Sequence, residues 1–273
     1  MLKQRILAAA VLIPAFLAAM FLLDGPAFAA VMGAVVLLAS WEWTRLAAIP
    51  IPVSQAVYIA TMALAMWLLW VSPARIDLWH WLLIAALLWW SLVLLWIVRH
   101  RSDGGPGLPS LLKLNAGYLV LLPAWVALVS LHTERGPYWL LFLLVVVWVA
   151  DSGAYFVGKA WGRRKLAPGI SPGKSIEGVY GGMLASVIPA LGFGWALGFR
   201  ASELLALVLL TVLCAAFSVV GDLFESLLKR QANMKDSSHL IPGHGGVLDR
   251  IDSVTAAAPW FVMGLSWIAG GGT

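Results

Sequence analysis

Residues 204–230 read L-L-A-L-V-L-L-T-V-L-C-A-A-F-S-V-V-G-D-L-F-E-S-L-L-K-R. No charged side chain occurs before Asp222, and four charged residues then follow, beginning with Asp222 itself. A helix rises about 1.5 Å per residue and needs about 20 mostly apolar residues to cross the hydrocarbon core of a bilayer. The stretch therefore predicts a transmembrane helix over residues 203–224, with a carboxylate just inside one end.

The composition extends this prediction to the whole chain. Of the 273 residues, 62% are hydrophobic and 11% are charged, and the mean hydropathy is +0.90, whereas a soluble domain has about 25% charged residues. We therefore predict an all-α, polytopic integral membrane protein that forms a single membrane-embedded domain over residues 1–273. Nine apolar runs are candidates for spanning helices: 6–23, 27–48, 53–71, 78–98, 115–131, 137–157, 178–199, 203–224 and 254–270.

Basic residues are distributed unevenly between the two sides that nine helices define. Of the 18 Lys and Arg residues, 15 fall on the side of the N-terminus, and only Arg75, Arg135 and Arg200 fall on the other. Cytoplasmic loops of membrane proteins carry an excess of Lys and Arg, so the N-terminus is predicted to be cytoplasmic. The formal charge of +5 then fits cytoplasmic loops and anionic lipid headgroups rather than nucleic acid.

Asp222 and the residues after it form a polar helical face. At about 3.6 residues per turn, Asp222, Glu225, Ser226 and Lys229 lie on one side of the helix, with Arg230 beside them. A carboxylate at membrane depth is costly unless it faces a polar cavity, a cation or a partner charge. A structural ion pair between Asp222 and Lys229 would meet this requirement, and so would a site for a cation or a substrate.

The next segment carries a glycine-rich turn followed by charged residues. Residues 242–246 read P-G-H-G-G, and glycines allow successive backbone N–H groups to surround an anion. Asp249, Arg250 and Asp252 follow directly. Carboxylates beside such a turn suit Mg²⁺ shared with substrate phosphates, because Mg²⁺ prefers oxygen ligands. A zinc site is disfavoured, since the two histidines of this segment lack a third histidine or a cysteine at a useful spacing.

A second basic segment covers residues 151–178. Part of it resembles a P-loop, but the pattern G-x-x-x-x-G-K-[ST] would require glycine at Pro168, and no soluble β-strand precedes it. We therefore reject a Walker nucleotide fold but keep the expectation that Ser171 and Lys174 contact phosphate. Asp151 is expected at a helix end, facing the same cavity.

The charged segment 226–252 resembles a known family. The patterns S-x-L-K-R from Ser226, K-D at 235–236 and H-G-G-x-x-D-R-x-D from His244 are similar, without departure, to the signature of phosphatidate cytidylyltransferases, also called CDP-diacylglycerol synthases. Residues 151–178 resemble a second block of that family. The resemblance implies the reaction of CTP with phosphatidate to give CDP-diacylglycerol and pyrophosphate, at the cytoplasmic side of a bacterial inner membrane.

The resemblance also implies roles for individual residues. Asp222 and Asp249 match the family's metal-binding acids and are expected to hold Mg²⁺. The expected catalytic residues are Asp222, Asp249, Lys229 and Arg250. The expected substrate-binding residues are Ser226, Arg230, Lys235, His244, Gly245, Gly246, Asp151, Ser171 and Lys174. Family members are found as dimers and some use a monovalent cation such as K⁺, so a homodimer and K⁺ are expectations from the resemblance alone.

Two other activities fit part of the pattern. A CTP-dependent lipid kinase, for example one acting on a polyprenol, would transfer the γ-phosphate and release CDP, so the identity of the products separates it from a cytidylyltransferase. A transporter is also compatible with nine helices and an intramembrane acid. Its expected marks are broken helices in related halves and polar residues at the membrane midplane, whereas here the polar residues gather on one side. None of the motifs indicates which residues select cytosine.

Overall fold

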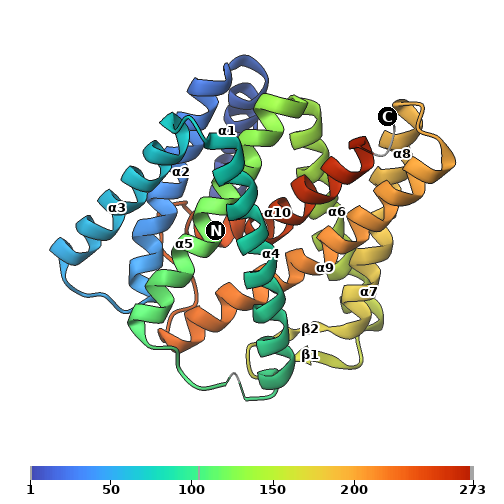
Figure 1. Ribbon diagram of the computed structural model, residues 1–273. Helices are drawn as coiled ribbons and strands as arrows, with labels where there is room; N and C mark the ends of the chain where they lie inside the picture. The colour runs from blue at the N-terminus through green and yellow to red at the C-terminus, as the bar shows by residue number, and fades with distance from the viewer. Residues whose placement is uncertain (1, 104, 271–273) are drawn as a thin grey trace.

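The computed structural model describes residues 2–103 and 105–270, which form a helical bundle with one short hairpin of strands (Figure 1). Lys3 and Arg5, two of the basic residues on the side of the N-terminus, are not among the residues whose side chains the structure describes. In chain order the elements are α1 (Leu2–Leu22), α2 (Gly25–Leu46), α3 (Pro52–Val71), α4 (Arg75–His100), α5 (Ser110–Ser130), the π-helix η1 (Leu131–Arg135), α6 (Pro137–Trp161), β1 (Lys165–Ala167), β2 (Ser171–Ser175), α7 (Ile176–Ala185), α8 (Val187–Ala196), α9 (Ala201–Gln231) and α10 (Leu248–Gly270).

Within these ranges, eight helical segments are long and apolar enough to cross a membrane, and α1 adds a shorter apolar helix over Ile6–Leu22. Each of the nine predicted spans thus contains a helix. The predicted span 178–199 is divided, because α7 ends at Ala185 and α8 begins at Val187. Pro189 accounts for the division: it has no N–H to donate to the carbonyl of Ala185, and its ring clashes with that carbonyl.

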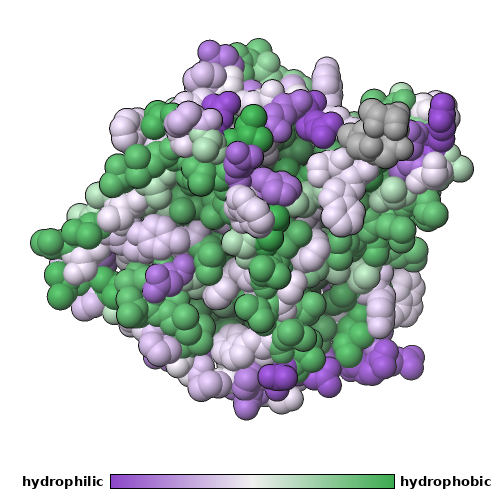
Figure 2. All heavy atoms as spheres, in the orientation of Figure 1, coloured by the Kyte–Doolittle hydropathy of each residue, from purple (hydrophilic) through white to green (hydrophobic). Residues whose placement is uncertain are grey.

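Apolar side chains cover the flank of the bundle. Figure 2 shows hydrophobic atoms over much of the visible face and hydrophilic atoms mainly along its upper and lower margins. Leu88, Leu92 and Leu95 of α4 are 64%, 61% and 59% exposed. Lipid tails are as apolar as leucine, so such a surface is stable in a bilayer and unfavourable in water. The chain is a multi-pass membrane protein.

Helices α9 and α10 run alongside each other near the centre of the bundle (Figure 1). Gly221 of α9 permits their close approach, because a Cβ atom at this position would collide with the backbone carbonyl of Asp252 in α10. Nearer the middle of the pair, the buried Cys214 Sγ lies 3.7 Å from the carbonyl oxygen of Ala257. The contact at Gly221 places Asp222 beside the first turns of α10, where the charged residues of the signature lie.

Candidate active site

Helix α9 extends seven residues beyond the predicted end of its span, from 224 to Gln231. Lys229 and Arg230 therefore occupy its last turn, where the negative end of the helix dipole favours basic side chains. The helix carries four residues of the predicted site: Asp222, Ser226, Lys229 and Arg230.

Helix α10 begins at Leu248, six residues before the predicted start of its span at 254. Asp249, Arg250 and Asp252 were expected in a loop and instead lie in the first turns of a helix. Acidic residues are favoured at this end, because it carries the positive end of the helix dipole. The polar segment between the two helices is therefore confined to residues 232–247.

The second basic segment also differs from its prediction. Helix α6 continues to Trp161, so Asp151 lies well inside the helix and not at its end. Strands β1 and β2 form an antiparallel hairpin in which Lys165 pairs with Ser175 and Ala167 pairs with Ser171. Lys174 therefore projects from a strand, two residues before the start of α7.

Lys229 links α9 to α10. Its Nζ lies 2.6 Å from Asp249 Oδ1 and 3.2 Å from Glu225 Oε1. The side chains of Lys229 and Asp249 are 13% and 5% exposed, so this charge-assisted hydrogen bond is largely shielded from water and stronger than a neutral one. The alternative of a structural pair between Asp222 and Lys229 is wrong, because the lysine turns to α10.

Asp249 organises the loop between the helices. Besides Lys229, its carboxylate accepts hydrogen bonds at Oδ2 from Ser237 N at 2.9 Å, Ser237 Oγ at 2.9 Å and Gly246 N at 2.8 Å. These contacts tie both ends of the loop to the start of α10. Both oxygens of Asp249 are therefore already engaged by the protein.

Asp222 joins α9 to the hairpin. Lys174 Nζ lies 2.5 Å from Asp222 Oδ2, and Ser226 Oγ donates to Asp222 Oδ1 at 3.2 Å. The side chains of Lys174 and Asp222 are 25% and 33% exposed, so this pair is more open than the pair of Lys229 and Asp249. The structure thus brings the two predicted polar segments together. Ser171 lies at the turn end of β2, away from this contact.

Two further carboxylates lie near Asp222. Asp151 of α6 and Asp252 of α10 both interact electrostatically with Asp222 and with Lys174. Sequence reasoning counted Asp252 among the carboxylates beside the glycine-rich turn but did not include it in the expected site residues. Its signal was the spacing D-R-I-D, which places Asp249 and Asp252 three residues apart on neighbouring turns of one helix. Three carboxyl groups from three helices thus lie around Lys174.

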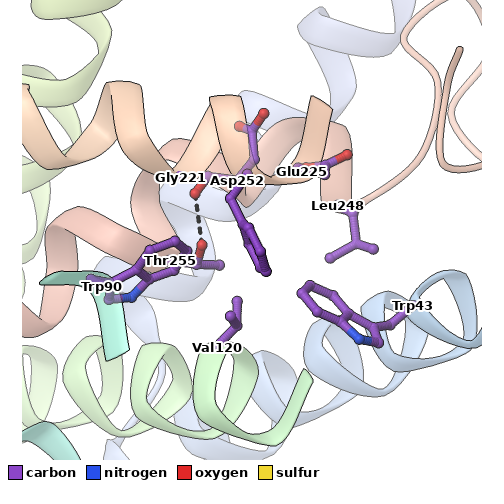
Figure 3. Close-up of a pocket in the computed structure, with 9 residues that line it drawn as sticks. Trp43, Trp90, Val120, Gly221, Glu225, Leu248, Asp252 and Thr255 are labelled. Carbon is purple, nitrogen blue, oxygen red and sulfur yellow. Dashed lines mark hydrogen bonds between the residues drawn. The ribbon is translucent and has the colours of Figure 1, made fainter. Parts of the chain in front are cut away.

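A small cavity lies below the charged residues (Figure 3). Its lining includes Trp43, Trp90, Glu225 and Asp252, and the ring of Phe224 lies 5.9 Å from that of Trp90. Its volume of about 10 Å³ is close to the minimum that one water molecule needs. A nucleotide does not fit in this cavity, whose lining is mainly aromatic and aliphatic.

Three exposed basic residues lie close in sequence to the acidic residues of the site. Arg230, Lys235 and Arg250 are exposed, and among the described residues none of them forms an ion pair. His244 is partly buried, and its Nδ1 has no hydrogen-bond partner among the residues that the structure describes. The three exposed cations have the charge and freedom to meet phosphate oxygens.

The glycine-rich turn gathers N–H groups around anions, but these anions belong to the protein. Gly243 and Gly245 have φ of +76° and +84°, a region that L side chains rarely adopt. The N–H of Gly246 donates to Asp249, and those of Val247 and Leu248 donate to a second carboxylate. Contact of this turn with substrate phosphate remains a prediction.

That second carboxylate is Glu42, which sequence reasoning missed. Glu42 belongs to α2, far from the signature in sequence, and its side chain is fully buried. The available signal was its position within W-E-W at 41–43 in an apolar span, because an acid at membrane depth indicates a buried partner. The identity of that partner was not readable from the sequence.

Comparison with known proteins places the chain in a family. The sequence profile of the cytidylyltransferase family matches residues 3–268, and the chain belongs to this family. It is 47% identical over 273 residues to the phosphatidate cytidylyltransferase of Pseudomonas aeruginosa, covering 100% of this chain and 99% of that protein. It is 42% identical to the phosphatidate cytidylyltransferase of Haemophilus influenzae, covering 96% of this chain and 97% of that protein.

Proposed function

We propose that the protein transfers the cytidylyl group of CTP to phosphatidate, giving CDP-diacylglycerol and pyrophosphate. The observation that carries the proposal is the end-to-end similarity to relatives named for this activity, combined with the convergence of signature residues from α9, α10 and β2. A lipid phosphate and a water-soluble nucleotide must meet at the membrane surface. A polar cluster at the ends of spanning helices suits that meeting.

The reaction requires charge stabilisation rather than proton removal. An oxygen of the phosphatidate phosphate forms a bond to the α-phosphorus of CTP, and the bond from that phosphorus to the bridging oxygen breaks. Pyrophosphate leaves with the bonding electron pair. The attacking phosphate is already anionic at neutral pH, so no general base and no covalent protein intermediate are needed. Positioned cations that stabilise the spreading negative charge supply most of the catalysis in such transfers.

The basic residues divide into fixed and free groups. Lys229 is held by Asp249 and Glu225, so it presents its charge in a set position. Arg230, Lys235 and Arg250 are free to close on phosphate oxygens, which suits capture of the triphosphate. In this proposal, Lys229 and Arg250 act on the reacting phosphates, while the other two cations bind substrate.

Mg²⁺ is part of the proposal, and the donor set fits it at Asp222. Among the residues that the structure describes, no three His, Cys, Asp or Glu side chains form a ready-made ion site. Mg²⁺ is commonly held by one or two carboxylates together with substrate phosphates and water, and the part-exposed Asp222 offers such a ligand. The ion would neutralise triphosphate charge. Asp249 would have to release one of its four hydrogen bonds to serve as a second ligand.

The transfer reaction is tested with purified protein, phosphatidate, Mg²⁺ and CTP labelled at the α-phosphate. We expect label in the lipid phase and an equal amount of pyrophosphate. Release of CDP together with a phosphorylated lipid acceptor would replace the proposal by a lipid kinase. Absence of any turnover by folded, inserted protein would contradict both and reopen transport.

We also propose that the protein lies in the inner membrane of a bacterial cell and that its site is on the cytoplasmic side. The support is the excess of basic residues on the side of the N-terminus. Sealed inner-membrane vesicles test it, because CTP does not cross a bilayer. Inside-out vesicles should be active without detergent, and right-side-out vesicles should become active only after permeabilisation; the reverse pattern would contradict the orientation. K⁺ dependence and a homodimer remain predictions. Replacement of K⁺ by another monovalent cation tests the first, and gel filtration tests the second.

A further inference from the structure

Glu42 is a buried carboxylate that the reaction as described does not use. It lies in α2 with 0% exposure, next to Trp43, whose indole N–H donates to the carbonyl of Lys113 in α5 at 2.7 Å. This contact fixes the helix around Glu42 to its neighbour. A buried carboxylate without partners would be strongly unfavourable, so the partners of Glu42 explain why the bundle keeps it.

Four donor groups lie within hydrogen-bond distance of Glu42, two at each oxygen. Oε1 accepts from Ser238 Oγ at 2.5 Å and from Val247 N at 2.9 Å. Oε2 accepts from Leu248 N at 2.7 Å and lies 3.1 Å from Ser237 Oγ, whose single hydroxyl proton is shared between Glu42 and Asp249. The donors come from the interior and the last residue of the loop 232–247 and from the first residue of α10. Glu42 therefore closes the loop from outside it.

The contact with Leu248 also caps α10. The first N–H groups of a helix have no partner within the helix, and its N-terminus attracts negative charge. Glu42 supplies both a hydrogen-bond acceptor and a negative charge there, from a different helix. The start of α10 at Leu248, earlier than the apolar pattern predicted, is thus secured by a residue about two hundred positions away in sequence.

A short chain of contacts connects Glu42 to the reacting centre. Ser237 Oγ is within hydrogen-bond distance of both Glu42 Oε2, at 3.1 Å, and Asp249 Oδ2, at 2.9 Å. Asp249 in turn holds Lys229 at 2.6 Å. Gly246 packs against the contact between Ser237 and Glu42. A Cβ atom at this position would collide with Ser237 Oγ and Glu42 Oε1.

We propose that Glu42 is a positioning residue for cytidylyl transfer, which sets the loop 232–247 and the start of α10 so that Asp249 holds Lys229 in its working position. The inference rests on the proposed function, and it adds a requirement on α2, outside both charged segments. Glu42 touches no substrate in this account. It acts through Ser237, Asp249 and Lys229.

The chemistry of the donors makes glutamine a sharp test. Each oxygen of Glu42 receives one backbone N–H, from Val247 or from Leu248. The amide group of glutamine would point its own N–H at one of these donors in either orientation. Glu42→Gln therefore keeps the size of the side chain but loses a hydrogen bond. It also places the amide N–H of glutamine against a backbone N–H, so that two donors face each other.

The experiment compares purified wild type, Glu42→Gln and Ser40→Ala in nanodiscs. Ser40 is a matched control, because it is also buried in α2 but, among the described residues, its hydroxyl bonds only to Val36 O of its own helix. Small misplacements of catalytic groups cost about 100-fold in rate, so we expect kcat per folded molecule to fall by roughly 10- to 100-fold in Glu42→Gln. The KM for CTP should change less than kcat, and Ser40→Ala should match wild type.

Amide hydrogen exchange supplies a readout that does not depend on turnover. We expect faster exchange in Glu42→Gln over residues 235–252 and unchanged exchange in α3 and α4. Exchange that rises throughout the protein, with kcat falling only in proportion to the unfolded fraction, would reduce Glu42 to a general stabilising residue and overturn the inference. Wild-type kcat in a folded Glu42→Gln variant would overturn it as well.

Ser238→Ala provides a second, milder variant if Glu42→Gln does not fold. It removes one of the four donors to Glu42, and we expect an intermediate loss of kcat and a local rise in exchange. Wild-type values of both quantities would contradict the inference. If wild type itself fails to transfer a cytidylyl group, the proposed function fails by that result, while the exchange data still decide whether Glu42 fixes the loop.

Discussion

Lys174 Nζ lies 2.5 Å from Asp222 Oδ2, so the hairpin and α9 meet at an ion pair with both side chains part-exposed. The lysine also interacts electrostatically with the nearby carboxyl groups of Asp151 and Asp252. A cation that enters with the triphosphate would replace it as the partner of Asp222. The lysine would then be free to contact a phosphate oxygen.

Lys174→Gln should lower kcat for cytidylyl transfer by roughly 100-fold, the cost of removing one positioned donor to developing negative charge. The thermal unfolding temperature should change little, because the pair is partly solvated and such pairs contribute about 1 kcal/mol or less. Lys165→Gln is the matched control, since Lys165 lies on the same hairpin, is exposed and forms no ion pair within the described residues. Equal activity of the two variants would contradict the role of Lys174.

Asp222→Asn and Asp249→Asn should separate a reaction role from a structural one. Asp222 is part-exposed and has one ion pair, so Asp222→Asn should abolish activity with little change in unfolding temperature. Asp249 accepts four hydrogen bonds in a largely buried place. Asp249→Asn should therefore lose activity and also about 3–5 kcal/mol of stability, as when one partner of a buried ion pair is removed.

Parallel assays of turnover and of thermal unfolding in detergent check both variants. Near wild-type turnover in Asp222→Asn would exclude this carboxylate as a metal ligand. An unfolding temperature of Asp249→Asn equal to that of wild type would show that its four contacts contribute nothing to folding.

Removal of Mg²⁺ gives a further test of Asp222. Chelation by EDTA should abolish transfer in wild type, and added Mg²⁺ should restore it. Asp222→Glu keeps the charge but displaces it by one methylene group. We therefore expect the Mg²⁺ concentration for half-maximal rate to rise by roughly 10-fold or more, as when residues that support a metal ligand are mutated. An unchanged Mg²⁺ dependence in Asp222→Glu, measured at saturating CTP, would show that the ion binds elsewhere.

Much of the architecture was predictable because it depends on local chemistry. Lipid demands long apolar helical segments, and eight of the nine predicted spans contain one, while the first contains the shorter apolar helix Ile6–Leu22. The helix ends were less predictable, since α10 begins at Leu248, whose N–H donates to Glu42 of another helix. A cap supplied by another helix leaves no local pattern, so hydropathy placed the start of the span at 254.

The site was predictable in membership but not in pairing. The signature identified Asp222, Lys229 and Asp249, but helical spacing suggested a pair between Asp222 and Lys229 within α9 as one alternative. Lys229 instead pairs with Glu225 of α9 and with Asp249 of α10, and the second contact depends on how closely α9 and α10 pack at Gly221. Spacing along one helix cannot report a distance between two helices, and for the same reason it could not connect Glu42 to the loop.

Gly246→Ala separates two explanations of the glycine-rich turn. The φ of Gly246 is not in the left-handed region, unlike that of Gly243 and Gly245, and alanine keeps the backbone N–H. If the turn served only to present N–H groups to phosphate, Gly246→Ala would be harmless. Because a Cβ atom would collide with Ser237 Oγ and Glu42 Oε1, we instead expect a loss of about 1–3 kcal/mol in stability, typical of overpacking, and a clear fall in kcat.

Gly173→Ala is the control for this substitution, because a Cβ atom at Gly173 in the hairpin meets nothing within 4 Å. Thermal unfolding and transfer kinetics of both variants provide the comparison. Equal behaviour of Gly246→Ala and Gly173→Ala would show that the loop can move away from Glu42 without consequence. A loss confined to Gly246→Ala would mean that the turn conserves space for the carboxylate of α2, and that its glycines serve the positioning of Asp249 as well as any contact with CTP.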